Sequence, residues 1–272
     1  MSKKKILFVS QEMSPFLELT EQAKTARQLP QKMQEKGFEI RALMPRFGNI
    51  NERRNRLHEV IRLSGINIVV NNTDNPLIIK VASIPSARMQ VYFLDNEDFF
   101  HRKTVFTDKK GVFHADNAER SIFFCIGVLE TVKKLGWAPD IIHCQGWMTS
   151  FIPVLLKTIY KDDPLFAESK AVTAIVENTF EGDVQENLQD ILVGSGLKAD
   201  DVSVFETGTC TNLTKGSLHY SDAVVHSGAN AELTALINKD HETMVNGETV
   251  DHDAYAEFYN GLVKDNHLET VE

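Results

Sequence analysis

The sequence contains little cysteine. Its 272 residues include three cysteines, Cys125, Cys144 and Cys210, which lie far apart and form no C-x-x-C pair. An odd number at such wide spacing argues against a disulfide framework and against a zinc site. We therefore expect no metal centre. The cysteine usage fits a reducing compartment, the cytoplasm, best.

Basic residues and long apolar runs are also scarce. There are 29 Lys and Arg against 38 Asp and Glu, a net charge of -9 at pH 7. Nucleic acids and anionic membranes require a basic footprint, so we expect neither as a partner, and the cluster Arg53, Arg54 and Arg56 is interpreted as a solvated turn. No run is long enough to span a bilayer. The apolar run 6–9, which follows Lys3 to Lys5, is too short for the core of a signal peptide.

A further absence concerns glycine. No G-x-G-x-x-G follows the first expected strand, residues 6–9, and the nearest glycine, Gly37, lies beyond the next helix. Dinucleotide-binding domains need these glycines to bring backbone amides against a pyrophosphate. A nucleotide-dependent oxidoreductase is therefore the weakest functional hypothesis, and we expect no cofactor.

What is present is a regular alternation of apolar strand-length runs with helical patterns. The strands expected are residues 6–9, 38–44, 140–143, 171–176 and 223–226, and the helices include 118–135, 147–160 and 184–193. This order is typical of α/β proteins, and predicts a Rossmann-like parallel sheet with helices on both faces. Residues 60–94 depart from the pattern, because short strands parted by turn residues predict a hairpin-rich insertion.

The last part of the chain is different in character. We expect one domain over residues 1–238 and, over 239–272, a polar linker followed by a helical tail. The tail has a helical stripe of Tyr255, Phe258, Tyr259 and Leu262. We expect this stripe to pack back on the domain.

Several motifs together resemble the N-terminal catalytic domain of bacterial glycogen and starch synthases. Asp116 to Arg120 spells Asp-Asn-Ala-Glu-Arg as in that family, and His143 to Trp147 stands where the family has His-x-His-Asp-Trp. The resemblance runs from about Lys5 to about Ile237 and implies one half of a GT-B fold. In that fold the N-terminal half holds the glucan acceptor, and a C-terminal half, without counterpart here, holds most of the ADP-glucose donor.

The loop after the first strand keeps the family's Pro-Phe at residues 15–16. Glu18, Leu19, Thr20 and Glu21 then occupy the family's Lys-Thr-Gly-Gly positions, where a lysine and glycine amides approach the donor phosphates. Two carboxylates would repel a diphosphate by about 1 kcal/mol or more at short range. The loop is therefore predicted to be unfit for a nucleotide sugar, and Glu18, Thr20 and Glu21 are candidate ligand-contacting residues.

The loop at His143 to Trp147 carries further candidates. Gln145 and Gly146 replace the family's second His and Asp, and Gln145 still donates and accepts hydrogen bonds. His143 is a candidate catalytic residue and Trp147 a candidate ligand contact, although a structural role for both is an equal alternative. Cys144 is interpreted as a small buried hydrophobe, since no base is evident beside it.

A third motif follows the next strand. Ile175, Val176, Glu177 and Asn178 match the family's Thr-Ile-His-Asn, whose His contacts the transferred sugar. Glu177 cannot replace a neutral imidazole donor unless it is protonated. It is a second candidate catalytic residue as a base, with a solvated loop position as the favoured alternative, and Asn178 is a candidate ligand contact.

Two other matches have structural explanations. Asp116 with Glu119 three residues later is a capping-box pattern at the start of the helix 118–135. Residues 46–48 match a family turn, for which we expect a structural role.

Three functions follow from these observations. The first is a non-catalytic or partner-dependent glucan-binding or regulatory module. The alternative is an ADP-glucose-dependent α-1,4-glucan glucosyltransferase, alone or completed by a separate C-terminal half. The third is the oxidoreductase already described as weakest. The expected partners are an α-glucan and either a separate GT-B C-terminal domain or a second copy of the chain.

Overall fold

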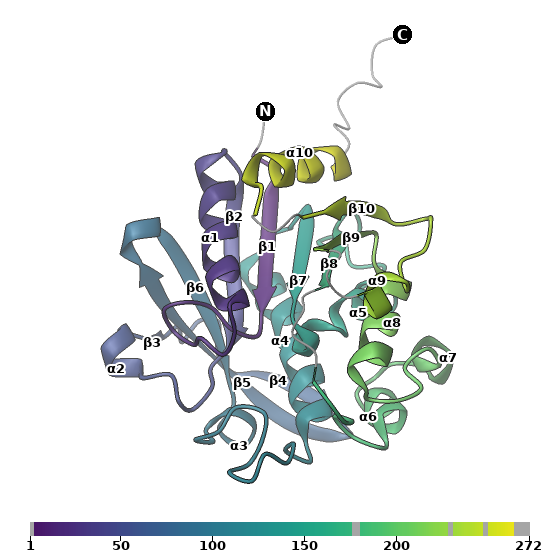
Figure 1. Ribbon diagram of the computed structural model, residues 1–272. Coiled ribbons are helices and arrows are strands. Elements are labelled where there is room, and N and C mark those ends of the chain that lie inside the picture. The colour runs from purple at the N-terminus through teal and green to yellow at the C-terminus, as the bar shows by residue number, and fades with distance from the viewer. Residues whose placement is uncertain (1–2, 176–179, 228–230, 247–249, 264–272) are drawn as a thin grey trace.

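The protein is built around one mixed sheet of ten strands (Figure 1). A computed structural model describes residues 3–175, 180–227, 231–246 and 250–263. The strand order is β10-β9-β8-β7-β1-β2-β6-β5-β3, with β4 paired to β5. The strands are β1 (Lys5–Ser10), β2 (Glu39–Pro45), β3 (His58–Glu59), β4 (Ile66–Val70), β5 (Thr73–Ile84), β6 (Met89–Asp95), β7 (Ile141–Gln145), β8 (Lys170–Ile175), β9 (Ala223–His226) and β10 (Glu242–Val245).

Helices of varied length connect the strands. The α-helices are α1 (Gln22–Glu35), α2 (Glu52–Asn55), α3 (Glu97–Phe100), α4 (Asn117–Leu135), α5 (Ile152–Lys157), α6 (Leu188–Gly194), α7 (Ala199–Val202), α8 (Cys210–Tyr220), α9 (Ala231–Thr234) and α10 (His252–Leu262). Two short 3-10 helices are η1 (Pro85–Ala87) and η2 (Trp147–Thr149). No helix among the described residues is long and apolar enough to cross a membrane.

The expected parallel sheet is confirmed. β10, β9, β8, β7, β1, β2 and β6 run parallel to one another. β2, the next strand along the chain, lies on one side of β1, and β7, a later strand, lies on its other side. The strand order therefore reverses between β1 and β7, and ligands of open α/β sheets bind beside such a switch point, at the carboxyl ends of the strands.

The expected hairpin-rich insertion is confirmed as well. β5 is 12 residues long and pairs antiparallel with β3, β4 and β6. It alternates buried and exposed side chains, as a strand with one face on the core does.

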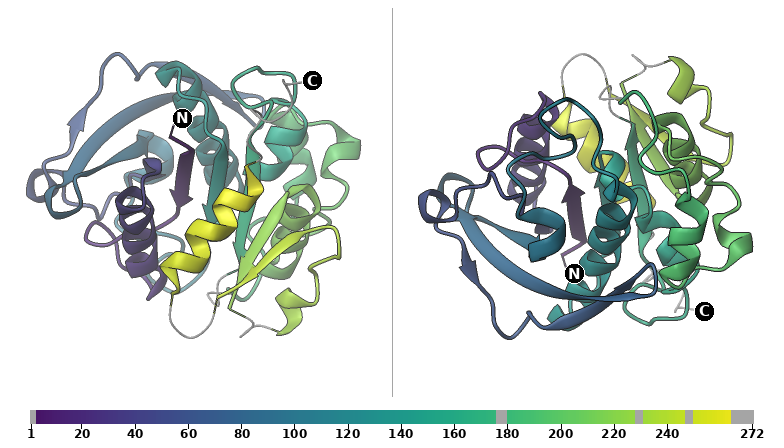
Figure 2. Two further views of the ribbon diagram at one scale, coloured as in Figure 1. Left: turned by 90° about the horizontal axis from the view of Figure 1, so that it is seen from above. Right: turned by 90° about the horizontal axis from the view of Figure 1, so that it is seen from below.

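Helices cover both faces of the sheet. On one face, Tyr255, Tyr259 and Leu262 of α10 pack with Ile6 and Phe8 of β1. In the left view of Figure 2, α10 crosses diagonally over the middle of the sheet, between α1 and β10. α4, α5 and α8 contribute to the core on the other face. The apolar stripe of the tail thus packs on the domain, as expected, with Phe258 partly buried and the other three side chains buried.

The range expected to be a polar linker contains a strand. β10 pairs in parallel with β9 and forms one edge of the sheet. Only Met244 of its four residues is buried, and Val245 is 64% exposed. An edge strand that buries one side chain has no apolar periodicity to detect in the sequence. The division of the chain at residue 238 stays a prediction.

The helix expected at 118–135 is confirmed, but the capping box at its start is wrong. The Asp116 side chain makes no cap hydrogen bond. It accepts from Nη1 of Arg102 at 2.6 Å and also from Nη2. A bidentate guanidinium contact is stronger than a bond to a neutral amide, so Arg102 takes the carboxylate. Gly136 ends the helix at φ 60°, as expected.

Two other helices are shorter than expected. The range 147–160 is divided into η2 and α5, and Pro153 lies in the first turn of α5, where a missing N–H costs little. The range 184–193 becomes helical only from Leu188.

Candidate functional site

The candidate site lies at the switch point between β1 and β7. The loop of residues 11–21 follows β1, and residues 146–150 follow β7. Register pairing places Ser10 beside Gln145, so both loops leave the sheet at the same edge.

The loop after β1 folds around the buried carboxylate of Glu12, which accepts hydrogen bonds from residues later in the loop. Glu12 is 2% exposed. Its Oε2 accepts the backbone N–H groups of Leu19 and Thr20 at 2.7 and 2.8 Å, and its Oε1 accepts the Thr20 hydroxyl at 2.6 Å. The Thr20 amide stands at the first of the two glycine positions, whose amides the family resemblance assigns to phosphate contact, and the Leu19 amide immediately precedes it. In this chain they already have an anionic partner.

The two other carboxylates of this loop face solvent. Glu18 accepts the Ser14 hydroxyl at 2.5 Å, and Glu21, with its side chain 84% exposed, forms an ion pair with Lys24 at 2.7 Å. The loop therefore presents negative charge where a diphosphate would need a cation.

Gly146 is required by the backbone and by its neighbour. Its φ of 92° with ψ 153° is a conformation that essentially only glycine adopts. A Cβ at this position would lie 2.6 Å from Cδ of Gln11. Gln11 also accepts the Met148 N–H at 3.3 Å. Gln11 thus fills the space that a longer residue at 146 would need.

Gln145 is used within the protein. It is 6% exposed, and its Nε2 donates to the carbonyl oxygen of Gln22 at 3.1 Å and to Oε1 of Gln22 at 3.3 Å. The side chain ties the end of β7 to the start of α1.

His143 is buried beneath α10. It is 2% exposed, and its Nδ1 lies 2.9 Å from the hydroxyl of Tyr259, with Phe8 and Tyr255 around the ring. Burial lowers the pKa of His143 to about 4. It therefore stays neutral near pH 7, and this environment favours the structural alternative for His143.

Trp147 belongs to an aromatic cluster. It is 8% exposed, and its ring centroid lies 4.9 Å from Phe106, 5.3 Å from Phe180 and 6.5 Å from Phe113. One edge of Trp147 still lines a pocket at the carboxyl ends of β7 and β8.

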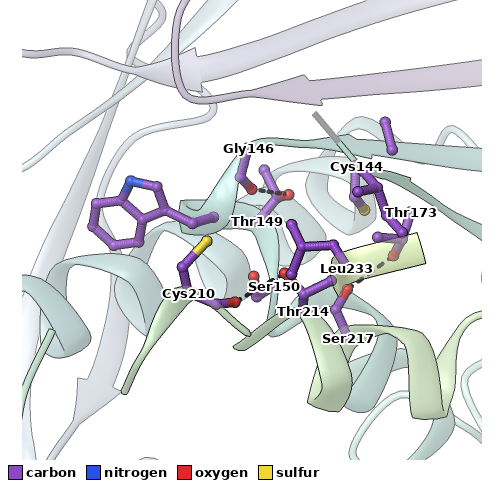
Figure 3. Close-up of a pocket in the computed structure, with 12 residues that line it drawn as sticks. Cys144, Gly146, Thr149, Ser150, Thr173, Cys210, Thr214, Ser217 and Leu233 are labelled. Carbon is purple, nitrogen blue, oxygen red and sulfur yellow. Dashed lines mark hydrogen bonds between the residues drawn. The ribbon is translucent and has the colours of Figure 1, made fainter. Parts of the chain in front are cut away.

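Seven of the twelve residues that line this pocket carry a hydroxyl or thiol group (Figure 3). The polar residues come from β7, η2, β8 and α8; they are Cys144, Thr149, Ser150, Thr173, Cys210, Thr214 and Ser217. Thr149 and Thr214 donate to carbonyl oxygens of their own loop or helix, and Thr173 bonds to Ser217. Within the described ranges, no three His, Cys, Asp or Glu side chains come together as metal ligands.

Neither cysteine of the pocket is a reactive thiol. Burial raises the pKa of the Cys144 and Cys210 thiols, so neither forms a thiolate near neutral pH. The expectation that Cys144 is a small buried hydrophobe agrees with its 1% exposure.

The structure brings some of the predicted residues together. Glu18, Thr20 and Glu21 share one loop, and Gln145 reaches the start of α1 beside it. Glu177 and Asn178 lie outside the described residues. A role of any of these residues in ligand binding stays a prediction.

Sequence reasoning missed Gln11 and Glu12. Their position directly after a buried strand is visible in the sequence and could have indicated a role. Their contacts with Gly146, Leu19 and Thr20 form only in the fold and could not be predicted. The hydroxyls of α8 were missed too, although Thr214 and Ser217 follow Cys210 at helical spacing.

The match at residues 46–48 has a packing explanation, as expected. A Cβ on Gly48 would lie 2.4 Å from the Arg102 carbonyl oxygen. Arg46 forms an ion pair with Glu52.

A further buried ion pair lies nearby. Asp95, at the end of β6, is fully buried and pairs with Lys80 at 2.9 Å.

Curated relatives are similar to this chain over most of its length. A glycogen synthase of Chlorobium limicola is 36% identical over 255 residues, 89% of this chain and 52% of the relative. A glycogen synthase of Chlorobium luteolum is 41% identical over 231 residues, 82% of this chain and 47% of the relative. The chain thus spans about half the length of the curated relatives it matches.

A solved structure shares the fold. The catalytic domain of starch synthase IV from Arabidopsis thaliana, bound to ADP and acarbose, matches with a TM-score of 0.72 at 18% identity, over 93% of this chain and 53% of that structure. The fold is that of one half of a GT-B glycosyltransferase. The family model of the starch synthase catalytic domain matches residues 5–231. The chain therefore belongs to the starch synthase catalytic domain family.

Proposed function

We propose that this chain is a glycogen-synthase-related module that binds α-glucan or regulates its synthesis and does not transfer glucose from ADP-glucose on its own. The observation that carries the proposal is the loop after β1. Glu12 occupies the amides of Leu19 and Thr20, and Glu18 and Glu21 add negative charge.

Electrostatics makes this loop a poor donor site. A diphosphate that contacts the Thr20 amide would need to displace the Glu12 carboxylate from a charge-assisted hydrogen bond worth about 1.5–3 kcal/mol. It would also be repelled by two further carboxylates. The loop contains no lysine that could offset this repulsion. Lys24, on the helix α1 that follows the loop, is already paired with Glu21.

The switch point supports the same conclusion. The Gln11 side chain lies where a side chain at position 146 would project, and Gln145 is engaged with Gln22. The two polar groups that the family resemblance places here for sugar or ribose contact are thus replaced by internal contacts.

The glucan part of the proposal rests on family membership and on the pocket beside Trp147. Sugar hydroxyls both donate and accept, and hydroxyl side chains that already donate to carbonyl groups keep lone pairs free to accept. The acceptor is the ligand that the resemblance implies for this half of the fold.

Titration with maltoheptaose tests glucan binding. The protein has two tryptophans, so a Trp137→Phe variant leaves Trp147 as the fluorescence reporter. Trp137 lies after α4 and donates to Glu39, away from the pocket. We expect millimolar maltoheptaose to change Trp147 emission and to release or absorb heat in calorimetry. No signal in either measurement would contradict glucan binding.

A loop variant tests the donor part. Replacing Glu18 by Lys and Glu21 by Gly restores two family residues, and we expect weak ADP binding only when Glu12→Gln is added, because the amides are then less firmly held. ADP binding by the unaltered chain, measured by calorimetry, would contradict the proposal. Addition of the C-terminal half of the Chlorobium limicola relative tests partner dependence, with glucose transfer as the signal.

A further inference from the structure

An arginine patch lies at the β3 edge of the protein. It consists of Arg53 and Arg54 of α2, Arg56, Arg62 and the neighbouring Ile61. All four arginines are exposed, and Ile61 is 82% exposed. Among the described residues, none of the four guanidinium groups has an acidic or other hydrogen-bond partner.

The backbone that carries the arginine patch is anchored by a helix cap and by buried apolar side chains. The Asn51 side chain accepts the Arg54 N–H at 2.8 Å and caps α2. Leu63 is buried beneath the turn, and Leu57 and Val60 pack against the core. Arg56 has φ 54°, a left-handed conformation that costs a bulky residue about 1–2 kcal/mol and that Gly or Asn adopts more easily.

The composition of the patch suits a protein interface. Arginine is enriched at the cores of protein interfaces relative to the rest of the surface. The rest of the chain is strongly acidic. Without these four arginines, 25 basic residues remain against 38 acidic ones, a net charge of -13.

A complementary surface exists on the same chain. α6 and α7 lie side by side, because Nε2 of Gln189 donates to the carbonyl oxygens of Val202 and Ser203 at 3.4 Å. Their acidic end consists of Asp190, Asp200 and Asp201, beside the exposed Lys198 at the start of α7, and Val193, which is 42% exposed, lies one turn after Asp190 on α6. No basic partner of these three carboxylates occurs in the part of the chain that the structure describes.

The two surfaces cannot meet within one molecule. The Asn72 N–H donates to the Gly194 carbonyl, so the tip of the β4–β5 hairpin lies against α6. β3 pairs with β5 at Lys80 and Val81. Eight residues of extended strand separate these contacts, about 25 Å. Figure 1 shows β3 and α7 at opposite ends of the molecule, left and right.

We infer that the arginine patch of one chain docks on the acidic end of α6 and α7 of a second copy. Arginines match carboxylates in charge and fork geometry, and Ile61 meets Val193 as the apolar contact. The contact joins two different surfaces, so it is heterologous and leads to rings or open chains of subunits. It does not depend on the proposed function.

Sedimentation velocity of the full chain tests this inference. At about 50 mM salt we expect the average sedimentation coefficient to rise with protein concentration, and at about 500 mM salt to fall to the monomer value, because exposed charges are then screened. Arg53→Glu with Arg54→Glu should weaken association at least tenfold, and Asp190→Lys with Asp200→Lys should do the same.

Mixing the two variants gives the decisive result. The intact surfaces of the two variants still match, and the two charge-reversed surfaces are complementary to each other, so an equimolar mixture should associate again, although each variant alone is monomeric. Lys109→Glu with Lys110→Glu is the matched control for charge, since both lysines are exposed outside the patch; it should associate like the unaltered chain. Circular dichroism confirms that each variant is folded.

Three results would overturn the inference. They are a monomeric unaltered chain at low salt up to high micromolar concentration, equal loss of association in the lysine control, and folded variants whose mixture remains monomeric.

Discussion

The hydroxyl of Tyr259 lies 2.9 Å from Nδ1 of His143, so that α10 contacts the middle of β7 across 116 positions of sequence. Both residues are buried, at 0% and 2% exposure. The contact places a polar pair inside the apolar face that α10 covers. It explains how the histidine at the start of a motif resembling a catalytic one can be a structural residue.

Tyr259→Phe should therefore destabilise the protein without removing much apolar contact. It leaves Nδ1 of His143 without its buried partner, which costs about 1–3 kcal/mol. The melting temperature and the urea midpoint measure the loss. Glu257→Ala, an exposed change on the same helix, is the control and should have little effect. Equal stability of Tyr259→Phe and the unaltered chain would show that this bond contributes nothing.

The low pKa of His143 predicts acid sensitivity. The folded pKa is about 4, below the unfolded value of about 6.5. The unfolded chain therefore binds an extra proton between these values, and stability falls as pH drops from about 6.5 to about 4. The loss attributable to His143 should reach a few kcal/mol. His143→Gln should reduce the slope of unfolding free energy against pH in this window, and an unchanged slope would contradict the assignment.

Gly146 and Gln11 should behave as a coupled pair. Gly146→Asp forces a side chain into a positive-φ position and against Gln11, so we expect destabilisation of about 1–3 kcal/mol. Gln11→Ala in the same chain removes the steric part. A double-mutant cycle by denaturant unfolding should give a favourable coupling of about 1 kcal/mol. Strict additivity would mean that the two side chains do not compete for this space.

Removal of α10 should weaken the fold strongly. A chain ending at residue 249 lacks the helix and exposes the face formed by Ile6, Phe8 and Phe38. Burial of Tyr255, Tyr259 and Leu262 contributes about 1.5–3 kcal/mol for each apolar side chain. A chain ending at residue 238 loses β10 as well, and the difference between the two truncations measures the edge strand. An unchanged melting curve would show that α10 is not held on the domain.

Much of the fold could be predicted because buried parallel strands are continuous apolar runs. Residues 6–9 and 223–226 are recognisable by composition alone. β10 is not, since Met244 is its only buried side chain. The predicted helix cap at Asp116 was wrong because Arg102, which binds the Asp116 carboxylate in place of the backbone amides, comes from a separate loop.

The site was less predictable than the fold. The exposed carboxylates Glu18 and Glu21 follow from the motif comparison, whereas the role of Glu12 depends on how the loop closes over it. The environment of His143 depends on α10, which no local pattern around β7 reveals.

The transfer of labelled glucose from ADP-glucose to glycogen tests the central claim most directly. The isolated chain is first shown to bind maltoheptaose, and the full-length glycogen synthase of Chlorobium limicola serves as the active reference. We predict no incorporation above the blank without protein. Incorporation that rises with the concentration of the isolated chain would contradict the claim.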